Sequence, residues 1–216
     1  MNDLTKQMQT SCTTDQWTKL LKFLDLVKEW NKKINLVSRK DIDQLIEHHL
    51  APCLAFSTLG RIKAGENILD IGSGGGFPGL VNAILFPQTK FTLVDARKKK
   101  VDALNDMIKQ LQLENATAYW GRIEELGEEK KWNNAFDRTT SRAVAPLADL
   151  YNWSLPFIKS EGTVEALKGG DVSAEVLMLT ADKKIPATAV TLHLLSEEWG
   201  LSERLSDLVI VSIKKT

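Results

Sequence analysis

The pattern of hydrophobic and polar positions divides the chain into two unequal parts. In residues 14–30, hydrophobic side chains recur every three or four positions, which predicts an amphipathic helix. Residues 41–56 repeat this spacing, although Pro52 is expected to break or bend the second helix. No alternation typical of a strand precedes residue 66. We therefore expect residues 1–60 to form a helical segment that packs on the remainder of the chain.

In residues 61–216, short apolar runs alternate with stretches of helical spacing. This alternation predicts a parallel sheet with helices on both of its faces. The expected strands are 67–71, 90–95, 116–120, 137–141 and 163–167. The expected helices are 79–86, 98–111, 145–153 and 173–183. Two final apolar runs, 187–195 and 208–214, have no helix between them and predict an antiparallel hairpin at the end of the sheet.

Composition narrows the class of protein without identifying it. The 216 residues include 28 basic and 28 acidic side chains, so bulk charge does not favour nucleic acid, although a local basic patch remains possible. No run of 18 apolar residues exists to span a membrane, and the polar start of the chain predicts a cytoplasmic protein. Cys12 and Cys53 have neither metal-ligand nor disulfide-framework spacing, so we expect reduced thiols and no metal.

The most informative segment is the glycine-rich stretch from Asp70 to Gly79, which follows an apolar run. A strand end, a glycine loop and a helix together are typical of nucleotide sites in doubly wound folds. A P-loop is excluded because no Lys-Ser/Thr pair follows the glycines. Counted from Gly74, the spacing matches the dinucleotide fingerprint G-x-G-x-x-G. Counted from Asp70, it matches the D-x-G-x-G-x-G pattern of S-adenosylmethionine sites, and the loop alone does not decide.

Two carboxylates favour S-adenosylmethionine. Asp70 ends the first strand, where it could bind the methionine ammonium group, whereas beside a dinucleotide pyrophosphate its charge would be repelled. Asp95 ends the second strand, where a carboxylate can accept both hydroxyls of a ribose. The competing structural interpretation is a tight turn with an acid that caps the next helix.

Seven motifs occur in order between about residue 30 and residue 170: 31–38 (NKKINLVS), the pair 48–49 (HH), 76–79 (GFPG), 92–95 (TLVD), 121–125 (GRIEE), 141–147 (SRAVAPL) and 167–169 (LKG). Together they resemble the bacterial 16S rRNA guanine-N7 methyltransferase family, also called glucose-inhibited division protein B. The resemblance implies an α/β, Rossmann-like class I S-adenosylmethionine-dependent methyltransferase. Its fold would be a mostly parallel seven-stranded sheet with a C-terminal antiparallel hairpin and an N-terminal helical extension.

The resemblance also implies roles at matching positions. Gly72 and Phe77 would line the cofactor cleft, Asp95 would hold the ribose, and Ile123 and Glu124 would flank the adenine. The full set of expected cofactor-binding residues is Asp70, Gly72, Gly74, Gly76, Phe77, Asp95, Ala96, Arg97, Ile123, Glu124 and Arg142. No catalytic base is expected, because guanine N7 carries a free lone pair and needs only alignment with the methyl group.

Basic residues suggest how RNA could be held. Lys98 and Lys99 lie in a basic run at a predicted helix start, and Lys168 follows the fifth strand on the ligand side of the sheet. The alternative for the run is a solvated helix face. We expect Arg142 to bind the methionine carboxylate or an RNA phosphate rather than N7, whose lone pair must react, with a structural ion pair as the alternative.

Three further expectations concern details and partners. Adjacent His48 and His49 point to different sides of a helix, which favours capping or packing over metal binding. Arg138 and Thr139 stand where the family is usually apolar, which predicts a wetter strand edge. The expected partner is 16S rRNA or the small ribosomal subunit particle, with no membrane and a monomeric enzyme. A nicotinamide-dependent oxidoreductase and a non-catalytic RNA-binding module are the alternatives.

Overall fold

The computed structural model describes residues 3–59, 61–183, 185–195 and 207–216, and within them a seven-stranded sheet forms the centre of the molecule. The strand order is β3-β2-β1-β4-β5-β7-β6. The strands are β1 (Asn67–Ile71), β2 (Lys90–Asp95), β3 (Ala116–Trp120), β4 (Phe136–Arg142), β5 (Ile158–Gly169), β6 (Val190–Leu194) and β7 (Leu208–Lys214). β1 to β5 are parallel, whereas β7 is antiparallel to β5 and to β6. The predicted mostly parallel sheet with a terminal antiparallel hairpin is confirmed.

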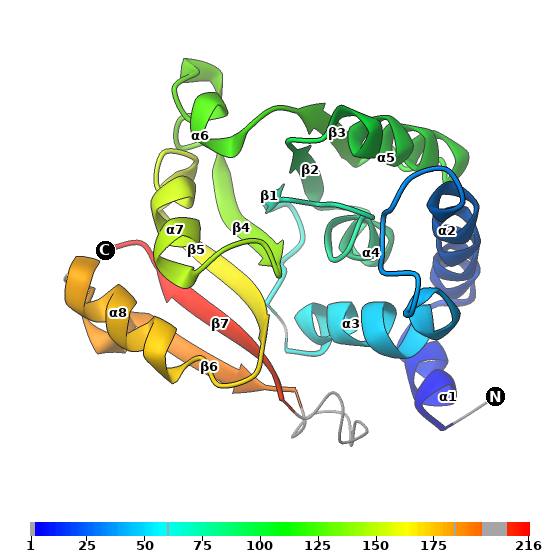
Figure 1. Ribbon diagram of the computed structural model, residues 1–216, viewed down its shortest axis with the longest axis horizontal. Helices are drawn as coiled ribbons and strands as arrows, with labels where there is room; N and C mark the ends of the chain where they lie inside the picture. The colour runs from blue at the N-terminus through cyan, green and yellow to red at the C-terminus, as the bar shows by residue number, and fades with distance from the viewer. Residues whose placement is uncertain (1–2, 60, 184, 196–206) are drawn as a thin grey trace.

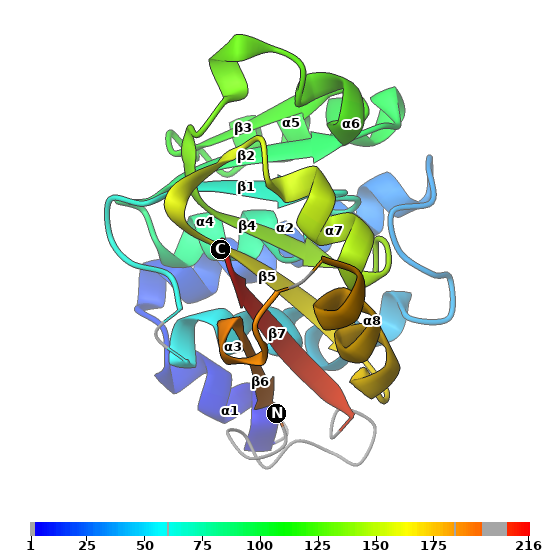
Figure 2. The ribbon, with the colours of Figure 1, turned by 90° about the vertical axis from the view of Figure 1, so that its left-hand side faces the viewer.

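Helices cover both faces of this sheet (Figure 1). α6 (Ile123–Leu126), α7 (Leu147–Ser154) and α8 (Ser173–Lys183) lie on one face. α3 (Ala51–Thr58), α4 (Gly79–Leu85) and α5 (Lys98–Gln110) lie on the other. The view in Figure 2 shows the strands stacked from β3 to the terminal hairpin between these two sets of helices. The sheet is therefore the middle layer of an α/β sandwich.

The N-terminal helices add a further layer outside α4 and α5. α2 (Thr14–Asn31) begins at a capping box, in which the Thr13 side chain accepts a hydrogen bond from the Gln16 backbone and the Gln16 side chain accepts one from the Thr13 backbone. Its apolar stripe packs into the same core as residues of α4 and α5. A short helix, α1 (Asp3–Thr10), precedes α2 and was not expected from the sequence.

The prediction of a single helix over residues 41–56 is right that the region is helical but wrong about the kind of helix. A 3-10 turn, η1 (Ile42–Gln44), is followed by a π-helix, η2 (Ile46–Leu50), and then by α3. The Ala51 N–H donates to the Ile46 carbonyl across the wider π turn. Pro52 occupies the first turn of α3, where its missing N–H is tolerated, and the chain therefore continues through it.

The strand around Arg138 and Thr139 is not wetter than its neighbours, which corrects the sequence-based expectation. Arg138 is 8% exposed and Thr139 is 1% exposed. The Thr139 hydroxyl lies 2.9 Å from that of Ser154, and the Arg138 guanidinium bonds to Thr163 and to buried Glu165. Polar residues are accommodated in this strand because they satisfy each other in pairs.

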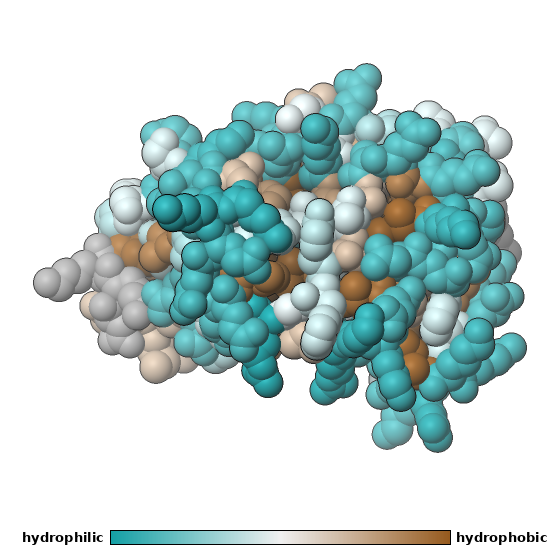
Figure 3. Space-filling view, turned by 90° about the horizontal axis from the view of Figure 1, so that it is seen from above, coloured by the Kyte–Doolittle hydropathy of each residue, from teal (hydrophilic) through white to brown (hydrophobic). Residues whose placement is uncertain are grey.

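Hydrophilic residues cover most of the face shown in Figure 3, with hydrophobic areas showing between them. Among the described residues, no helix is both long enough and apolar enough to cross a membrane. The remaining 3-10 turns, η3 (Lys130–Trp132) and η4 (Ala187–Ala189), lie in connections, and η4 shortens the predicted strand 187–195 to β6.

The division into residues 1–60 and 61–216 stays a prediction, and the shared core makes it testable. Leu20 of α2 is fully buried, whereas its neighbour Leu21 is 40% exposed. We expect Leu20→Ala to lower the free energy of unfolding by about 2–5 kcal/mol, and Leu21→Ala to change it by less than about 1 kcal/mol. Urea denaturation followed by circular dichroism measures both. An unchanged main transition in Leu20→Ala would mean that the helical segment unfolds separately.

Candidate functional site

The glycine loop follows β1, and its first residue, Gly72, packs against Val144 in the segment that follows β4. Gly72 has φ +68°, and a Cβ atom there would lie 2.6 Å from Cγ2 of Val144. Glycine is required at this position because the backbone is left-handed and the Val144 side chain leaves no room. The loop is also fixed by β2, since the N–H groups of Gly72 and Ser73 both donate to the Val94 carbonyl.

Asp95, the last residue of β2, connects the glycine loop to the start of α5. Its Oδ2 accepts a hydrogen bond from the Gly74 N–H at 2.9 Å, and its Oδ1 accepts one from the Arg97 N–H at 2.8 Å. Each carboxylate oxygen keeps a second lone pair for another donor. The side chain is therefore held in a fixed orientation at the edge of a cavity, where it can still accept hydrogen bonds from a ligand.

Two adjoining cavities flank Asp95. The larger has a volume of about 520 Å³ and is lined by the glycine loop, the end of β2, the turn after β4 and part of the N-terminal segment. The smaller, of about 180 Å³, extends toward Ile123 and Glu124 and also touches Trp153. Both are lined by Gly72, Asp95, Ala96 and Val144. The pair of cavities thus forms one cleft along the carboxyl ends of β1, β2 and β4.

The structure brings most of the predicted cofactor-binding residues to this cleft. Those that line it are Gly72, Gly74, Phe77, Asp95, Ala96, Arg97, Ile123, Glu124 and Arg142. Gly76 does not line it: a Cβ atom there would lie 2.9 Å from Cδ1 of Leu80, so this glycine instead permits close packing against α4. Phe77 lies between two other aromatic rings, with centroids 5.0 Å from Phe23 and 5.1 Å from His49.

Asp70 lies behind the glycine loop rather than in the cleft. It is fully buried, and its Oδ1 accepts a hydrogen bond from the Thr140 hydroxyl at 2.8 Å. A Cβ atom at Gly79 would lie 2.5 Å from its Oδ2, so α4 packs directly on the carboxyl group. Burial raises the pKa of Asp70 to about 6. The direct contact with a methionine ammonium group that the sequence suggested is not offered by this geometry.

Arg142, at the end of β4, joins the sheet to the N-terminal segment. Its Nη2 donates to the His48 carbonyl at 2.6 Å, and its Nη1 donates to the His49 carbonyl at 3.4 Å. His48 Nδ1 lies 3.0 Å from Oδ1 of Asp41, while the His49 ring borders the cleft. Burial, with Arg142 nearby, lowers the pKa of His49 to about 4, so this ring is neutral near pH 7. Burial also raises the pKa of the nearby Cys53 thiol to about 12.

Sequence reasoning missed part of the cleft wall. Leu36, Val37 and Ser38 border the larger cavity, as do Lys100 and Ala143. The 31–38 motif could have indicated these residues. Oδ1 of its first residue, Asn31, accepts hydrogen bonds from the N–H groups of Leu36 and Val37. That asparagine shapes the turn that brings the segment to the cleft.

The predicted RNA-binding lysines differ in their surroundings. Lys98 forms an exposed ion pair with Asp102 at 3.2 Å, and its Nζ lies 5.8 Å from the centre of the Trp120 ring. Lys99 is exposed beside it. Lys168 is largely buried: its Nζ donates to the Ala145 carbonyl at 3.1 Å and lies 2.9 Å from Oε2 of Glu175. Lys98 and Lys99 are therefore accessible to a large ligand, whereas Lys168 holds the turn after β4.

Comparison with known proteins agrees with this arrangement. The family model for rRNA small subunit methyltransferase G matches residues 16–197. The ribosomal RNA small subunit methyltransferase G of Chlorobium luteolum is 45% identical over 161 residues, 74% of this chain and 66% of that protein. The corresponding protein of Chlorobaculum tepidum is 40% identical over 176 residues, 82% of this chain and 79% of that protein.

Solved structures share the fold at low sequence identity. A precorrin-6y C5,15-methyltransferase from Geobacter metallireducens has a TM-score of 0.55 at 13% identity, covering 85% of this chain and 92% of that one. An S-adenosylmethionine-dependent O-methyltransferase from Thermotoga maritima has a TM-score of 0.56 at 15% identity, covering 75% and 64%. The fold is that of class I S-adenosylmethionine-dependent methyltransferases. Because the family model covers most of its length, the chain belongs to the rRNA small subunit methyltransferase G family.

Proposed function

We propose that this chain transfers a methyl group from S-adenosylmethionine to N7 of a guanine in the 16S RNA of the small ribosomal subunit. The observation that carries the proposal is the position of Asp95, which is fixed between the glycine loop and α5 at the junction of two cavities. Family membership favours S-adenosylmethionine over the nicotinamide dinucleotide that the same glycine spacing permits. The nine predicted cofactor-binding residues that line the cleft favour an enzyme over a non-catalytic RNA-binding module.

The residues of the cleft fit the chemical groups of this cofactor. Asp95 can accept hydrogen bonds from the ribose hydroxyls, and the smaller cavity, with Ile123 and Glu124, suits the adenine. Gly72 gives a close approach to the backbone, since no side chain could be placed there. When bound, S-adenosylmethionine supplies a methyl group activated by a positively charged sulfur. Phe77 and the 36–38 segment would limit the access of water to the larger cavity.

No general base is required by the proposed reaction. Guanine N7 has a lone pair in the plane of the ring and carries no proton near neutral pH. The task of the protein is to align N7 with the methyl group and to tolerate the positive charge that develops on the purine. Arg142 contributes by holding the carbonyls of His48 and His49, which fixes the N-terminal segment against the cleft. Its remaining donors can meet an anionic group of the cofactor or of RNA.

The proposed substrate-binding surface includes the start of α5. Lys98 and Lys99 are exposed beside the cleft and can bind phosphates of the RNA backbone. Lys168 would contribute to RNA binding only by holding the turn after β4, because its ammonium group is already paired with Glu175. We infer that the enzyme is a monomer and acts in the cytoplasm on 16S rRNA or on the small-subunit particle.

The direct test is methyl transfer to small-subunit rRNA that lacks the modification. With labelled S-adenosylmethionine, we expect the label on a single guanine, at a position that gains the alkaline lability of N7-methylguanine. Gly72→Ala should abolish labelling because its Cβ atom would collide with Val144, whereas Gly169→Ala meets only Leu208 at 3.5 Å and should retain activity. Label on an exocyclic amine, or none on RNA, would contradict the proposed function.

The pH dependence of the chemical step tests the absence of a base. Since the pKa of His49 is lowered to about 4, this ring does not change charge between about pH 6 and about pH 9. Because the pKa of Asp70 behind the glycine loop is raised to about 6, the single-turnover rate at saturating cofactor should be nearly flat from about pH 7 to about pH 9, and His49→Ala should change it by less than about tenfold. A rate that follows one ionisation near pH 6.5, and loses this dependence in His49→Ala, would indicate a histidine base and a target atom that carries a proton.

A further inference from the structure

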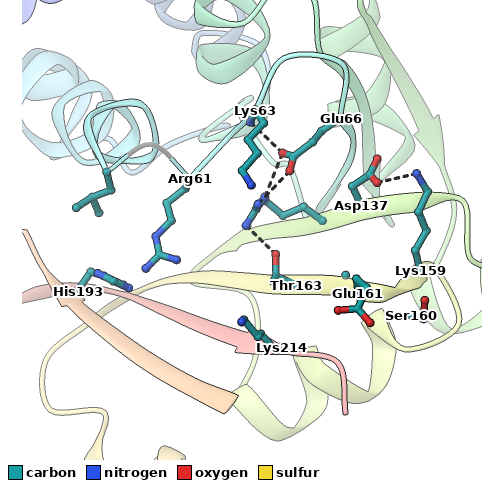
Figure 4. A pocket seen from close by; sticks show the side chains of 13 residues that line it. Arg61, Lys63, Glu66, Asp137, Lys159, Ser160, Glu161, Thr163, His193 and Lys214 are labelled. Carbon is teal, nitrogen blue, oxygen red and sulfur yellow. Dashed lines mark hydrogen bonds and ion pairs between the residues drawn. The ribbon is translucent and has the colours of Figure 1, made fainter. Parts of the chain in front are cut away.

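A second cavity lies at the end of the sheet where β1, β4 and β5 begin, whereas the cofactor cleft lies at the carboxyl ends of the parallel strands. Its volume is about 760 Å³, larger than either part of that cleft (Figure 4). It is bordered by the loop before β1, the first residues of β4, the first half of β5, His193 of β6 and the end of β7. Arg138 lies beside it on β4, while Arg142 of the same strand borders the cofactor cleft, about 13 Å further along. The two sites are therefore separate.

Much of the charge in this second cavity is already paired. Arg138 bonds to Glu66 at 3.1 Å and to Glu165 at 2.5 Å. Lys159 bonds to Asp137 at 2.6 Å, and a backbone N–H also donates to each of Glu66 and Asp137. Glu161 is exposed, and Figure 4 shows it beside Ser160, away from Arg61 and Lys63. Apart from exposed Glu161, the carboxylates that border the cavity are thus occupied by partners that form part of the fold.

Two lysines, unpaired within the described part of the chain, and the weakly paired Arg61 lie around the same cavity. Lys63 and Lys214 are exposed, and their ammonium groups have no hydrogen-bond or ion-pair partner among the described residues. Arg61 forms a longer ion pair, 3.8 Å from Glu165, which Arg138 and Ser212 also bind. Figure 4 shows Arg61 and Lys63 reaching in from the loop before β1 and Lys214 from the opposite side. An anion placed between them would be attracted to all three positive charges.

We propose that this cavity binds a phosphate-bearing anion, with Arg61, Lys63 and Lys214 as its ligands. An arginine fork and two ammonium groups suit the oxygens of phosphate. The volume admits a group as large as a nucleotide. The phosphate could belong to the backbone of the RNA substrate as it continues past the cofactor cleft, or to a free nucleotide or polyphosphate. In both cases the bound group is the same, and the cofactor cleft can be filled at the same time.

The first experiment titrates the full-length protein with sodium tripolyphosphate by calorimetry, in the presence of saturating S-adenosylhomocysteine to fill the cofactor cleft. We expect saturable binding with one site per chain. Arg61→Gln combined with Lys214→Gln should weaken it by about tenfold or more, and the gentler Lys63→Gln should weaken it by a smaller factor. The matched control combines Lys109→Gln and Lys130→Gln, two exposed lysines outside the cavity, and should bind as the unmodified protein does.

The second experiment identifies the source of the phosphate. It measures the affinity for a 16S rRNA fragment as a function of salt concentration, with the same two double variants. If RNA occupies the cavity, the slope of log affinity against log salt should fall by about 1.5 in the Arg61/Lys214 variant only. An unchanged slope together with tripolyphosphate binding assigns the site to a free phosphate ligand. Equal tripolyphosphate binding by all variants, or none by any, together with unchanged RNA slopes, would overturn the proposal, and neither result bears on methyl transfer.

Discussion

The geometry of the cofactor cleft depends on the carboxylate of Asp95. β1 and β2 are adjacent parallel strands, so the segments that follow them start at the same edge of the sheet. Asp95 connects these segments through the N–H groups of Gly74 and Arg97. A loop rich in glycine has many accessible conformations, and hydrogen bonds to a charged acceptor offset the entropy lost when it is fixed. The same carboxylate that would bind the ribose therefore also keeps the ribose site in shape.

The second constraint comes from the N-terminal segment, which closes the cleft from outside the sheet. Arg142 binds the carbonyls of the π-helix, and the Phe77 ring is held between Phe23 and His49. A change in the packing of α2 would thus reach the glycine loop through one aromatic contact. Residues 36–38 and His49 border the larger cavity, so the helical segment forms part of the wall of the cleft.

The parts of the structure that follow from local patterns could be predicted from the sequence, and those that depend on side-chain direction could not. β1, β2 and β3 have the predicted bounds because each is a short apolar run between turn residues. Asp70 was placed correctly at the end of β1, but strand side chains alternate between faces, and its carboxyl group points toward α4. Lys168 was predicted on the ligand side, yet its partner Glu175 comes from α8, a contact that no local pattern indicates.

The most direct test of this account is the affinity for S-adenosylhomocysteine, measured by calorimetry on folded Asp95→Ala. Loss of hydrogen bonds to this charged group should weaken binding by about 1.5–3 kcal/mol, whereas Asp102→Ala, which removes an exposed carboxylate from the same region, should have almost no effect. An affinity in Asp95→Ala equal to that of the unmodified protein would show that Asp95 does not organise the cleft.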